Sequence, residues 1–248
     1  MLHLPMDRWR DWIPSDCPGC GRRVGCQGLC PDCLTCLRPD AARPRCRRCA
    51  HPLNDAGHCP DCGPGTPAYD RVVAAFDYAG LGRDLVRNYK IRCRLSLARL
   101  LADLLAQSVR AAGSVDGPDW IVPVPARRAA LHQRGFSPPA EVARLLARQL
   151  GLRHRLDGVR RLREGDRQVG RDRVRRLQAQ TGAFACGVAG SLAGQRIAVV
   201  DDVLTTGATL QAVARVLKEA GAARVEGWVL ARAVDHRACD SSGGRVLQ

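Results

Sequence analysis

The segment IAVVDDVLTTGATL, residues 197–210, decides the class of fold that this sequence predicts. It opens with four apolar residues, Ile197 to Val200, in the pattern of a short strand buried on both faces of a parallel sheet. Two adjacent acids follow, and a small hydroxyl-rich loop then leads into a helix predicted from Thr209 to Ala220. A strand, a loop and a helix in this order form the repeating unit of α/β folds.

The polar residues of this segment also indicate what it binds. Side chains at the carboxyl end of a parallel strand face the crevice in which α/β proteins bind ligands. There Asp201 and Asp202 can accept hydrogen bonds from a vicinal diol or hold a hard cation. The loop after them offers a phosphate its backbone N–H groups, its hydroxyls and a helix N-terminus. Its residues are Thr205, Thr206, Gly207, Ala208 and Thr209. An exposed turn with a threonine cap would account for only one of these groups, so we interpret the segment as a cradle for a ribose and a phosphate.

Similar patterns on either side extend the α/β prediction. Further strands are expected at residues 71–76, 120–124 and 225–230, and further helices at 81–89, 95–111 and 138–150. Strands that alternate with helices predict a doubly wound parallel sheet. We place this domain at residues 69–234, followed by a C-terminal tail, 235–248, that is expected to be disordered.

The beginning of the chain differs from the rest because it is dense in cysteine. Ten of the 13 cysteines lie between Cys17 and Cys62, and eight of them form four C-x-x-C pairs. The sequence GLCPDC at residues 28–33 returns as GHCPDC at residues 57–62, and the other pairs recur with the same shift. This regularity indicates an internal duplication.

Each repeat supplies four thiols from two tight turns, which is the ligand set of a closed tetrahedral zinc site. We therefore predict a small double zinc ribbon at residues 15–64 that holds two structural Zn²⁺ ions. The predicted ligands are Cys17, Cys20, Cys30, Cys33, Cys46, Cys49, Cys59 and Cys62. We favour two sequential sites, although spacing alone does not decide whether the repeats close separately or interleave.

Five cysteines lie outside the C-x-x-C pairs, and the pairs themselves have two alternative roles. Cys26 and Cys36 fall outside the repeat and are interpreted as spare thiols, while Cys93, Cys186 and Cys239 are interpreted as ordinary ones. Disulfides are disfavoured by the odd number of cysteines and by a reducing compartment. A redox-active C-x-x-C is disfavoured because no βαβ pattern surrounds the pairs.

Composition and charge restrict the class of protein further. With 46% hydrophobic and 25% charged residues, the chain is neither globally disordered nor fibrous. A net charge of +15 favours anionic partners such as nucleic acid or phosphorylated metabolites, and an aromatic fraction of 4% disfavours an extended platform for stacked bases. No apolar stretch reaches the length of a membrane span, and residues 1–14 lack the apolar core of a signal peptide. We expect a cytoplasmic protein without membrane insertion.

Taken together, these motifs resemble a known family. The segment 197–210 resembles the signature with which type I phosphoribosyltransferases bind 5-phosphoribosyl-1-pyrophosphate (PRPP). With the cysteine repeats in front, the whole order of motifs is similar to that of the ComF family. The further motifs are FDYAG at 76–80, YK at 89–90, LARLLA at 97–102, VPVP at 122–125 and QRGF at 133–136. The resemblance covers the chain from about Cys17 to Arg232. It implies a double zinc ribbon, a phosphoribosyltransferase-type domain, and a role in natural transformation in which imported single-stranded DNA is handled.

The resemblance also implies roles for individual residues. Asp201 and Asp202, the candidate catalytic residues, would bind the ribose hydroxyls, and the loop Thr205–Thr209 would bind the 5′-phosphate. Arg127 and Arg128 occupy the place of the family's pyrophosphate loop, and Lys90 matches the lysine after its first helix. Mg²⁺ would accompany PRPP, because the departing pyrophosphate develops negative charge that arginine and a metal ion can stabilise.

The sequence departs from the family pattern at several polar positions. Ser137 and Pro138 follow QRGF where the family usually has asparagine and glutamine. Gly165 stands in place of a usual threonine, and Ala179 in place of an expected asparagine. If those amides and hydroxyls position an acceptor or a lid, we expect PRPP binding without fast turnover.

Three functions remain open at this stage. The first is an enzyme in which an unidentified nucleophile displaces pyrophosphate from PRPP, with a nucleotide-salvage phosphoribosyltransferase as one variant. The second is a nucleic-acid-binding accessory in which the basic segment Arg153–Arg176 contacts phosphates and PRPP is a regulatory ligand. The third is an adapter whose ribbons dock a helicase-like competence protein. His132 is interpreted as a surface residue rather than a general base.

Overall fold

The computed structural model describes residues 14–25, 28–38, 43–62, 67–113, 117–163, 182–187 and 192–234. Several features predicted from the sequence lie outside these ranges, namely Cys26, Gly165, Ala179, Cys239, the tail 235–248 and much of the basic segment 153–176. No helix within the described ranges is long and apolar enough to cross a membrane.

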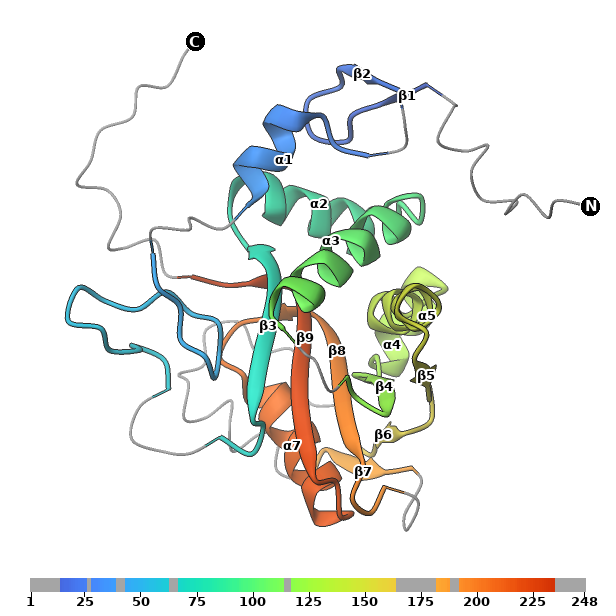
Figure 1. The fold of residues 1–248 in the computed structure, drawn as a ribbon. Coiled ribbons are helices and arrows are strands. Elements are labelled where there is room, and N and C mark those ends of the chain that lie inside the picture. Colours follow the sequence, from blue (N-terminus) through green and yellow to red (C-terminus); the bar gives the residue numbers. More distant parts are fainter. Residues whose placement is uncertain are drawn as a thin grey trace, which may run out of the picture.

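A five-stranded parallel sheet forms the centre of the molecule (Figure 1). Its strands are β3 (Arg71–Asp77), β4 (Trp120–Pro123), β5 (Arg153–His154), β8 (Arg196–Leu204) and β9 (Arg224–Arg232). They lie in the order β3-β9-β8-β4-β5, and every neighbouring pair is parallel. The inner strands β8 and β9 are the longest and are buried on both faces, because their sequences are largely apolar.

Helices cover both faces of the sheet, which confirms the predicted doubly wound arrangement. One face is covered by α2 (Gly80–Lys90), α3 (Leu97–Ala111) and α5 (Pro138–Leu150). The other is covered by α7 (Ala208–Glu219) and by a hairpin of β6 (Val159–Arg161) and β7 (Phe184–Cys186). Each face of the sheet has its own hydrophobic core. Successive residues of β8 point alternately into one core and into the other, because side chains of a strand alternate between its two faces.

The predicted elements agree with the structure to within two residues at most ends, with one extension and several omissions among the short elements, β5 included. The strand predicted to end at Val200 continues to Leu204, because Asp201, Val203 and Leu204 keep their pairing with β9. Both acids therefore lie on the sheet itself. The short helix α4 (Arg128–Arg134) and the β6–β7 hairpin were not predicted; α4 has no buried residue, so it carries no apolar periodicity.

The two cysteine repeats dock at different places. The first contains β1 (Ser15–Asp16), β2 (Arg23–Val24) and α1 (Pro31–Leu37), and α1 lies against α2 (Figure 1). Leu37, at the end of α1, is buried in the core that α2, α3 and α5 form on the sheet. The second, residues 43–62, lies beside β3 (Figure 1), where the Arg45 guanidinium donates two hydrogen bonds of 2.8 and 2.6 Å to the Asp77 carboxylate.

Candidate functional site

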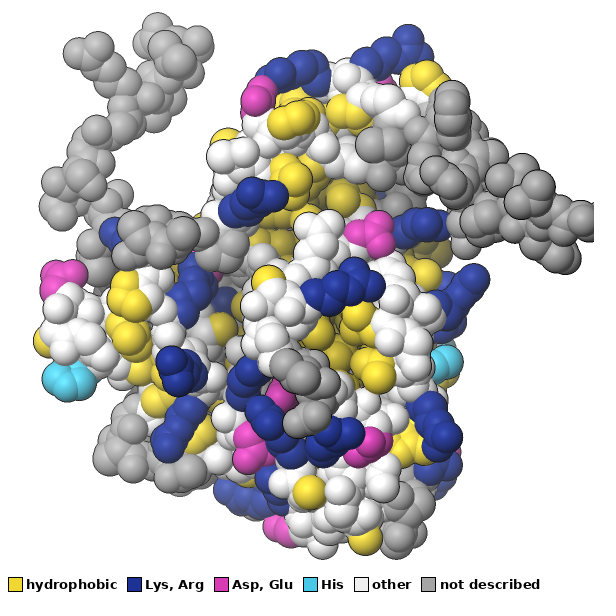
Figure 2. Space-filling view, viewed as in Figure 1, with side chains coloured by type: hydrophobic (Ala, Val, Ile, Leu, Met, Phe, Trp, Pro, Cys, Tyr) yellow, Lys and Arg dark blue, Asp and Glu magenta, His cyan; other side chains and the backbone are white. Residues whose placement is uncertain are grey.

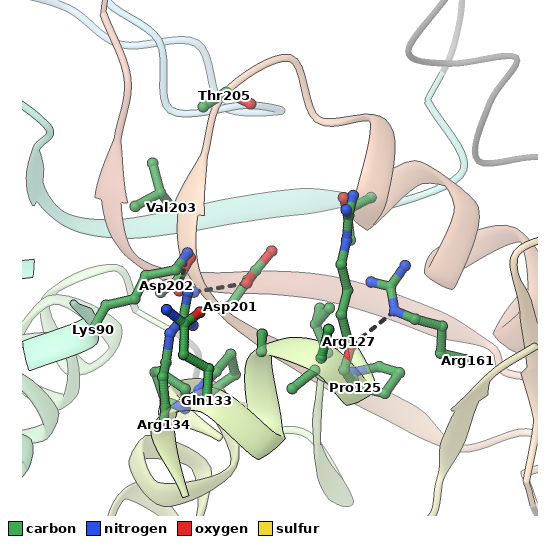
Figure 3. Close-up of a pocket in the computed structure, with 17 residues that line it drawn as sticks. Lys90, Pro125, Arg127, Gln133, Arg134, Arg161, Asp201, Asp202, Val203 and Thr205 are labelled. Atoms are coloured by element: carbon green, nitrogen blue, oxygen red, sulfur yellow. Dashed lines mark hydrogen bonds and ion pairs between the residues drawn. The ribbon is translucent and has the colours of Figure 1, made fainter. Parts of the chain in front are cut away.

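A pocket of about 620 Å³ opens at the carboxyl ends of β4 and β8 (Figure 3). Its walls come from the end of α2, the segment after β4 together with α4, the start of α5, the strand β6, and the end of β8 with the loop that follows. The charged and hydroxyl-bearing residues in these walls are Lys90, Arg127, Arg134, Arg161, Asp201, Asp202, Thr205 and Thr209. The pocket thus lies where an α/β sheet is expected to bind its ligand.

Asp202 forms a close ion pair at the floor of the pocket. Its side chain is buried, and the Lys90 ammonium lies 2.5 Å from its Oδ2 atom. Lys90 is the last residue of α2, and the buried residues Leu85 and Tyr89 hold that helix on the sheet. The fold therefore brings together two predicted site residues that are far apart in the sequence.

Asp201 lies beside this ion pair and is difficult to ionise. Burial and the negative charge of Asp202 raise the pKa of Asp201 to about 7, although Lys90 and Arg161 favour its charged form. Its Oδ1 atom accepts a hydrogen bond of 2.8 Å from the backbone N–H of Asp202. Without a ligand, this carboxyl group is therefore partly protonated at neutral pH, and hydroxyl donors or a cation would favour its ionised form.

The loop between β8 and α7 forms the far wall of the pocket. Thr205 and Thr209 line it, whereas the side chains of Thr206, Gly207 and Ala208 do not. Figure 3 shows Thr205 beyond Val203, away from the carboxylates. Gly207 has a left-handed conformation, φ 76°, and precedes the first residue of α7. The predicted loop thus places the N-terminus of a 12-residue helix next to the pocket, where its free N–H groups can bind an anion.

Arginine side chains stand on both sides of the acids. In Figure 3, Arg134 lies on the same side as Lys90, and Arg127 and Arg161 lie on the other. Arg127, which precedes α4, lines the pocket. Arg128, the first residue of α4, is not among the lining residues.

Arg161 is a pocket residue that sequence reasoning did not single out. Its Nε atom donates a hydrogen bond of 3.3 Å to the backbone oxygen of Pro125, and its guanidinium lies 4.5 Å from the ring centre of Phe184. The sequence placed it only within a long basic segment. The pairing of β6 with β7 brings Arg161 to the pocket. Because a long stretch of chain separates these two strands, no local sequence pattern predicts the contact.

The eight predicted zinc ligands form two separate clusters, each made by one repeat. Cys17, Cys20, Cys30 and Cys33 form the first, and Cys46, Cys49, Cys59 and Cys62 the second; within each cluster all sulfurs lie within 4.8 Å of one another. The sequential arrangement favoured from the sequence is therefore confirmed. Cys36 and Cys93 are exposed and Cys186 is half-buried, and none of the three belongs to a cluster.

The spacing of the sulfurs fits a tetrahedral metal ion. Four sulfurs about 2.3 Å from one zinc ion would lie roughly 3.8 Å apart. The contact between Cys46 and Cys62 is 3.6 Å and that between Cys49 and Cys59 is 3.4 Å, far longer than a disulfide bond. Burial disfavours ionisation of Cys17, but backbone N–H donors outweigh it and lower the pKa of this thiol to about 6. Burial raises the pKa of the Cys33, Cys49 and Cys62 thiols instead. The spacing of the sulfurs, and not the thiol pKa, therefore indicates a metal site.

The pocket as a whole combines three chemical capacities. Two adjacent acids can accept hydrogen bonds from a diol, a helix N-terminus can bind a phosphate, and three arginines can bind further phosphate oxygens. These capacities lie within one cavity on a doubly wound sheet.

Comparison with known proteins agrees with this combination. The family model described as a phosphoribosyl transferase domain matches residues 131–242, which include α5, β8, α7 and β9. This match indicates a phosphoribosyltransferase-type domain over residues 131–242, the part of the chain that carries the acids and the loop.

Two relatives make the assignment more specific. Competence protein F of Haemophilus influenzae is 30% identical over 211 residues, which cover 83% of this chain and 91% of the relative. The DNA utilization protein YhgH of Escherichia coli K12 is 30% identical over 213 residues, covering 84% and 92%. The chain belongs to the ComF family, the family of competence protein F.

Among solved structures, the glutamine PRPP amidotransferase of B. subtilis is similar to part of the chain. The identity is 24% and the TM-score 0.36, and the match covers 53% of this chain and 25% of that one. The chain thus spans about a quarter of the length of that enzyme.

Proposed function

We propose that this protein binds PRPP together with Mg²⁺ in the pocket at the carboxyl end of β8. The observation that carries the proposal is the pair of acids, Asp201 and Asp202, enclosed between Lys90 and the loop that leads into α7. Adjacent acids next to an anion-binding loop match a ligand that has both a vicinal diol and a phosphate. Membership of a family with a phosphoribosyltransferase domain supports the same ligand.

Each part of the ligand has a proposed counterpart in the pocket. Asp201 and Asp202 accept hydrogen bonds from the ribose hydroxyls, and the N–H groups and hydroxyls of Thr205–Thr209 bind the 5′-phosphate. Arg127 and Arg161 bind the pyrophosphate, and Arg128 adds positive charge at the start of α4. When Mg²⁺ is bound with PRPP, it neutralises negative charge on the pyrophosphate.

Transfer to an acceptor would follow from this binding. A nucleophilic atom of the acceptor forms a bond to C1′ of the ribose while the bond from C1′ to the pyrophosphate oxygen breaks. Pyrophosphate leaves with that electron pair, and the acceptor loses its proton to solvent. In this scheme the arginines stabilise the leaving group, and the acids fix the ribose ring. Release of pyrophosphate in the presence of candidate acceptors distinguishes this enzyme from a protein that uses PRPP only as a regulatory ligand.

A panel of fragments tests whether the pocket recognises the whole ligand. Mg²⁺–PRPP is expected to raise the melting temperature more than ribose 5-phosphate or pyrophosphate does, because only PRPP engages the acids, the loop and the arginines together. Asp103→Asn serves as a control, since Asp103 lies on α3 and accepts a hydrogen bond from Gln149 away from the pocket. If pyrophosphate alone stabilises the protein as much as PRPP, the ribose and phosphate contacts proposed here do not exist.

We also propose that each cysteine cluster holds a structural zinc ion. The fit of the sulfur spacing to a tetrahedral ion supports this assignment. Metal analysis of the purified protein is then expected to give two zinc ions per chain. A chain that is folded and metal-free, with titratable thiols, would contradict it.

A role in DNA uptake is a second proposal, and it rests on the relatives. One of them is named a competence protein and the others DNA utilization proteins. The net charge of +15 favours a polyanionic partner, and Lys and Arg side chains are spread over the face shown in Figure 2. Binding of single-stranded DNA that weakens steeply with salt and survives Asp201→Asn would support this role in the cytoplasm. Loss of a helicase-like partner on deletion of residues 15–64, with residues 69–234 still folded, would identify the ribbons as its docking surface.

A further inference from the structure

Arg232 is a buried cation at the end of the sheet, in a position that the proposed PRPP contacts do not use. It is the last residue of β9, and only 1% of its surface is exposed. Its Nε atom donates a hydrogen bond of 2.9 Å to the backbone oxygen of Cys49, and its Nη2 atom pairs with the Asp61 carboxylate. A buried guanidinium is costly unless its donors are satisfied, so its partners indicate what it does.

The Nη1 atom of Arg232 contacts the loop that we assign to the phosphate. It donates hydrogen bonds of 2.9 Å to the backbone oxygen of Leu204 and 2.6 Å to that of Thr205, and a third of 2.7 Å to that of Ala233. Leu204 is the last residue of β8, and Thr205 begins the loop before α7. These bonds fix the point at which the strand turns into the loop.

The other partners of Arg232 belong to the second cysteine repeat. Cys49 is a member of the second cluster, and Asp61 lies between the cluster residues Cys59 and Cys62. One guanidinium therefore connects the cluster to the loop. With a divalent metal ion bound, four thiolates would retain net negative charge and would compensate the buried cation. Burial lowers the pKa of Arg232, and the charges of Cys49 and Cys59 oppose that effect.

A second arginine docks the same repeat without touching the loop. Arg45, within the repeat, pairs with Asp77 at the end of β3 and donates a hydrogen bond of 3.0 Å to the backbone oxygen of Ala50. Asp77 and Arg232 are partners in the register of β3 and β9. The two ion pairs thus lie at the same end of the sheet, but only Arg232 reaches Leu204 and Thr205.

We propose that Arg232 is a positioning residue that makes the conformation of the loop 204–209 depend on the second cysteine cluster. The part that concerns PRPP affinity rests on the proposed function, whereas the coupling itself concerns only residues of this chain. The second cluster would then help to shape the ligand pocket in addition to stabilising its own repeat.

The duplication provides a matched pair of variants for the test. Asp61 in the second repeat, within GHCPDC, corresponds to Asp32 in the first repeat, within GLCPDC. Asp32 pairs with Arg22, 2.8 Å away, where both side chains are largely exposed, and it has no role near the loop. Asp61→Asn should weaken binding of Mg²⁺–PRPP by about tenfold or more, because a small displacement of a binding loop is enough for such a loss. Asp32→Asn should leave the affinity within about twofold.

Hydrogen exchange of the ligand-free protein measures the coupling between the second cysteine repeat and the loop directly. Amides of a peptide that spans residues 203–210 should exchange faster in Asp61→Asn than in the wild type, and at the wild-type rate in Asp32→Asn. Arg45→Gln should lower the melting temperature by loosening the repeat and yet leave exchange in this peptide unchanged. That contrast separates positioning of the loop from general stability.

The outcomes distinguish failure of this proposal from failure of PRPP binding. If the wild type does not bind PRPP but exchange in the loop responds to Asp61→Asn, the coupling holds and the ligand is wrong. If exchange in the loop is the same in Asp61→Asn and Asp32→Asn, Arg232 does not transmit the state of the second cluster. An equal rise in Arg45→Gln would likewise overturn the proposal, since any loosening of the repeat would then suffice.

Discussion

Lys90 and Asp202 form a close ion pair in the pocket. The ammonium offsets the charge of a buried carboxylate, and it lies next to the second acid, Asp201. Two adjacent acids, of which Asp202 is buried, would be hard to maintain without a nearby cation. The same arrangement holds the acids ready to accept hydrogen bonds from a ligand.

Replacement of Lys90 tests this contact. Lys90→Gln should lower the free energy of unfolding by about 1–2 kcal/mol, because a buried carboxylate loses its cation while the lysine itself is partly exposed. Lys218, the other lysine of the chain, pairs with Asp70 and provides the control. Lys218→Gln should cost about 0.5 kcal/mol or less in urea unfolding. If both variants lower the free energy of unfolding equally, the Lys90–Asp202 pair stabilises the fold no more than the Lys218–Asp70 pair does.

The raised pKa of Asp201 predicts a pH dependence of stability. Between its ordinary value of 3.8 and about 7, the folded chain binds more protons at this carboxyl group than the unfolded chain does. The free energy of unfolding therefore falls as the pH rises through this range. Asp201→Asn removes that loss, so the variant should gain about 1–2 kcal/mol relative to the wild type between about pH 5 and pH 8. Parallel stability profiles from urea unfolding at a series of pH values would contradict the assignment.

At the scale of elements, the β8–loop–α7 unit could be predicted from a short local pattern. Four apolar residues, two acids and a loop with glycine were enough to predict a strand, a crevice and a helix. The helices α3 and α5 were predictable because their apolar residues recur with helical periodicity. The extension of β8 to Leu204 was not, since pairing with β9 keeps the strand regular beyond its apolar run.

Gly207 is the residue on which the geometry of this loop depends. A Cβ atom at this position would lie 3.2 Å from the Tyr69 hydroxyl oxygen, and the backbone is left-handed. Gly207→Ala should therefore cost about 2–3 kcal/mol, from strained backbone and a close contact together.

Substitution of Gly135 separates the effect of the strained backbone from that of the close contact. It has nearly the same conformation, φ 75°, but a Cβ atom there would have no heavy atom within 4 Å. Gly135→Ala should cost only about 1 kcal/mol in the same urea unfolding experiment. If the two substitutions cost the same, the contact with Tyr69 does not constrain the loop.

The elements that sequence reasoning missed lack a local signal. α4 buries none of its residues, and β6 and β7 are three residues each and meet only through long-range pairing. They nevertheless supply Arg134 and Arg161 to the pocket. Site residues on short, exposed elements are therefore the part of the pocket that required the structure.

At the scale of the whole molecule, the cysteine spacing predicted both clusters and their sequential arrangement. It did not predict where each repeat would dock, because docking depends on long-range contacts: Leu37 packs into the core for the first repeat, and Arg45 pairs with Asp77 for the second. The second repeat thereby reaches the loop of the pocket through Arg232. The domain limits at residues 15–64 and 69–234 stay a prediction.

Asp201 and Asp202 are the proposed ribose site of a PRPP pocket, and calorimetric titration measures what they contribute to binding. Mg²⁺–PRPP should bind the zinc-loaded wild type with a Kd of about 1 μM, near −8 kcal/mol. The Asp201→Asn/Asp202→Asn variant should lose at least about a hundredfold in affinity, while Asp103→Asn should bind like the wild type. A folded wild type that does not bind Mg²⁺–PRPP, or a double variant that binds it equally well, would contradict the account.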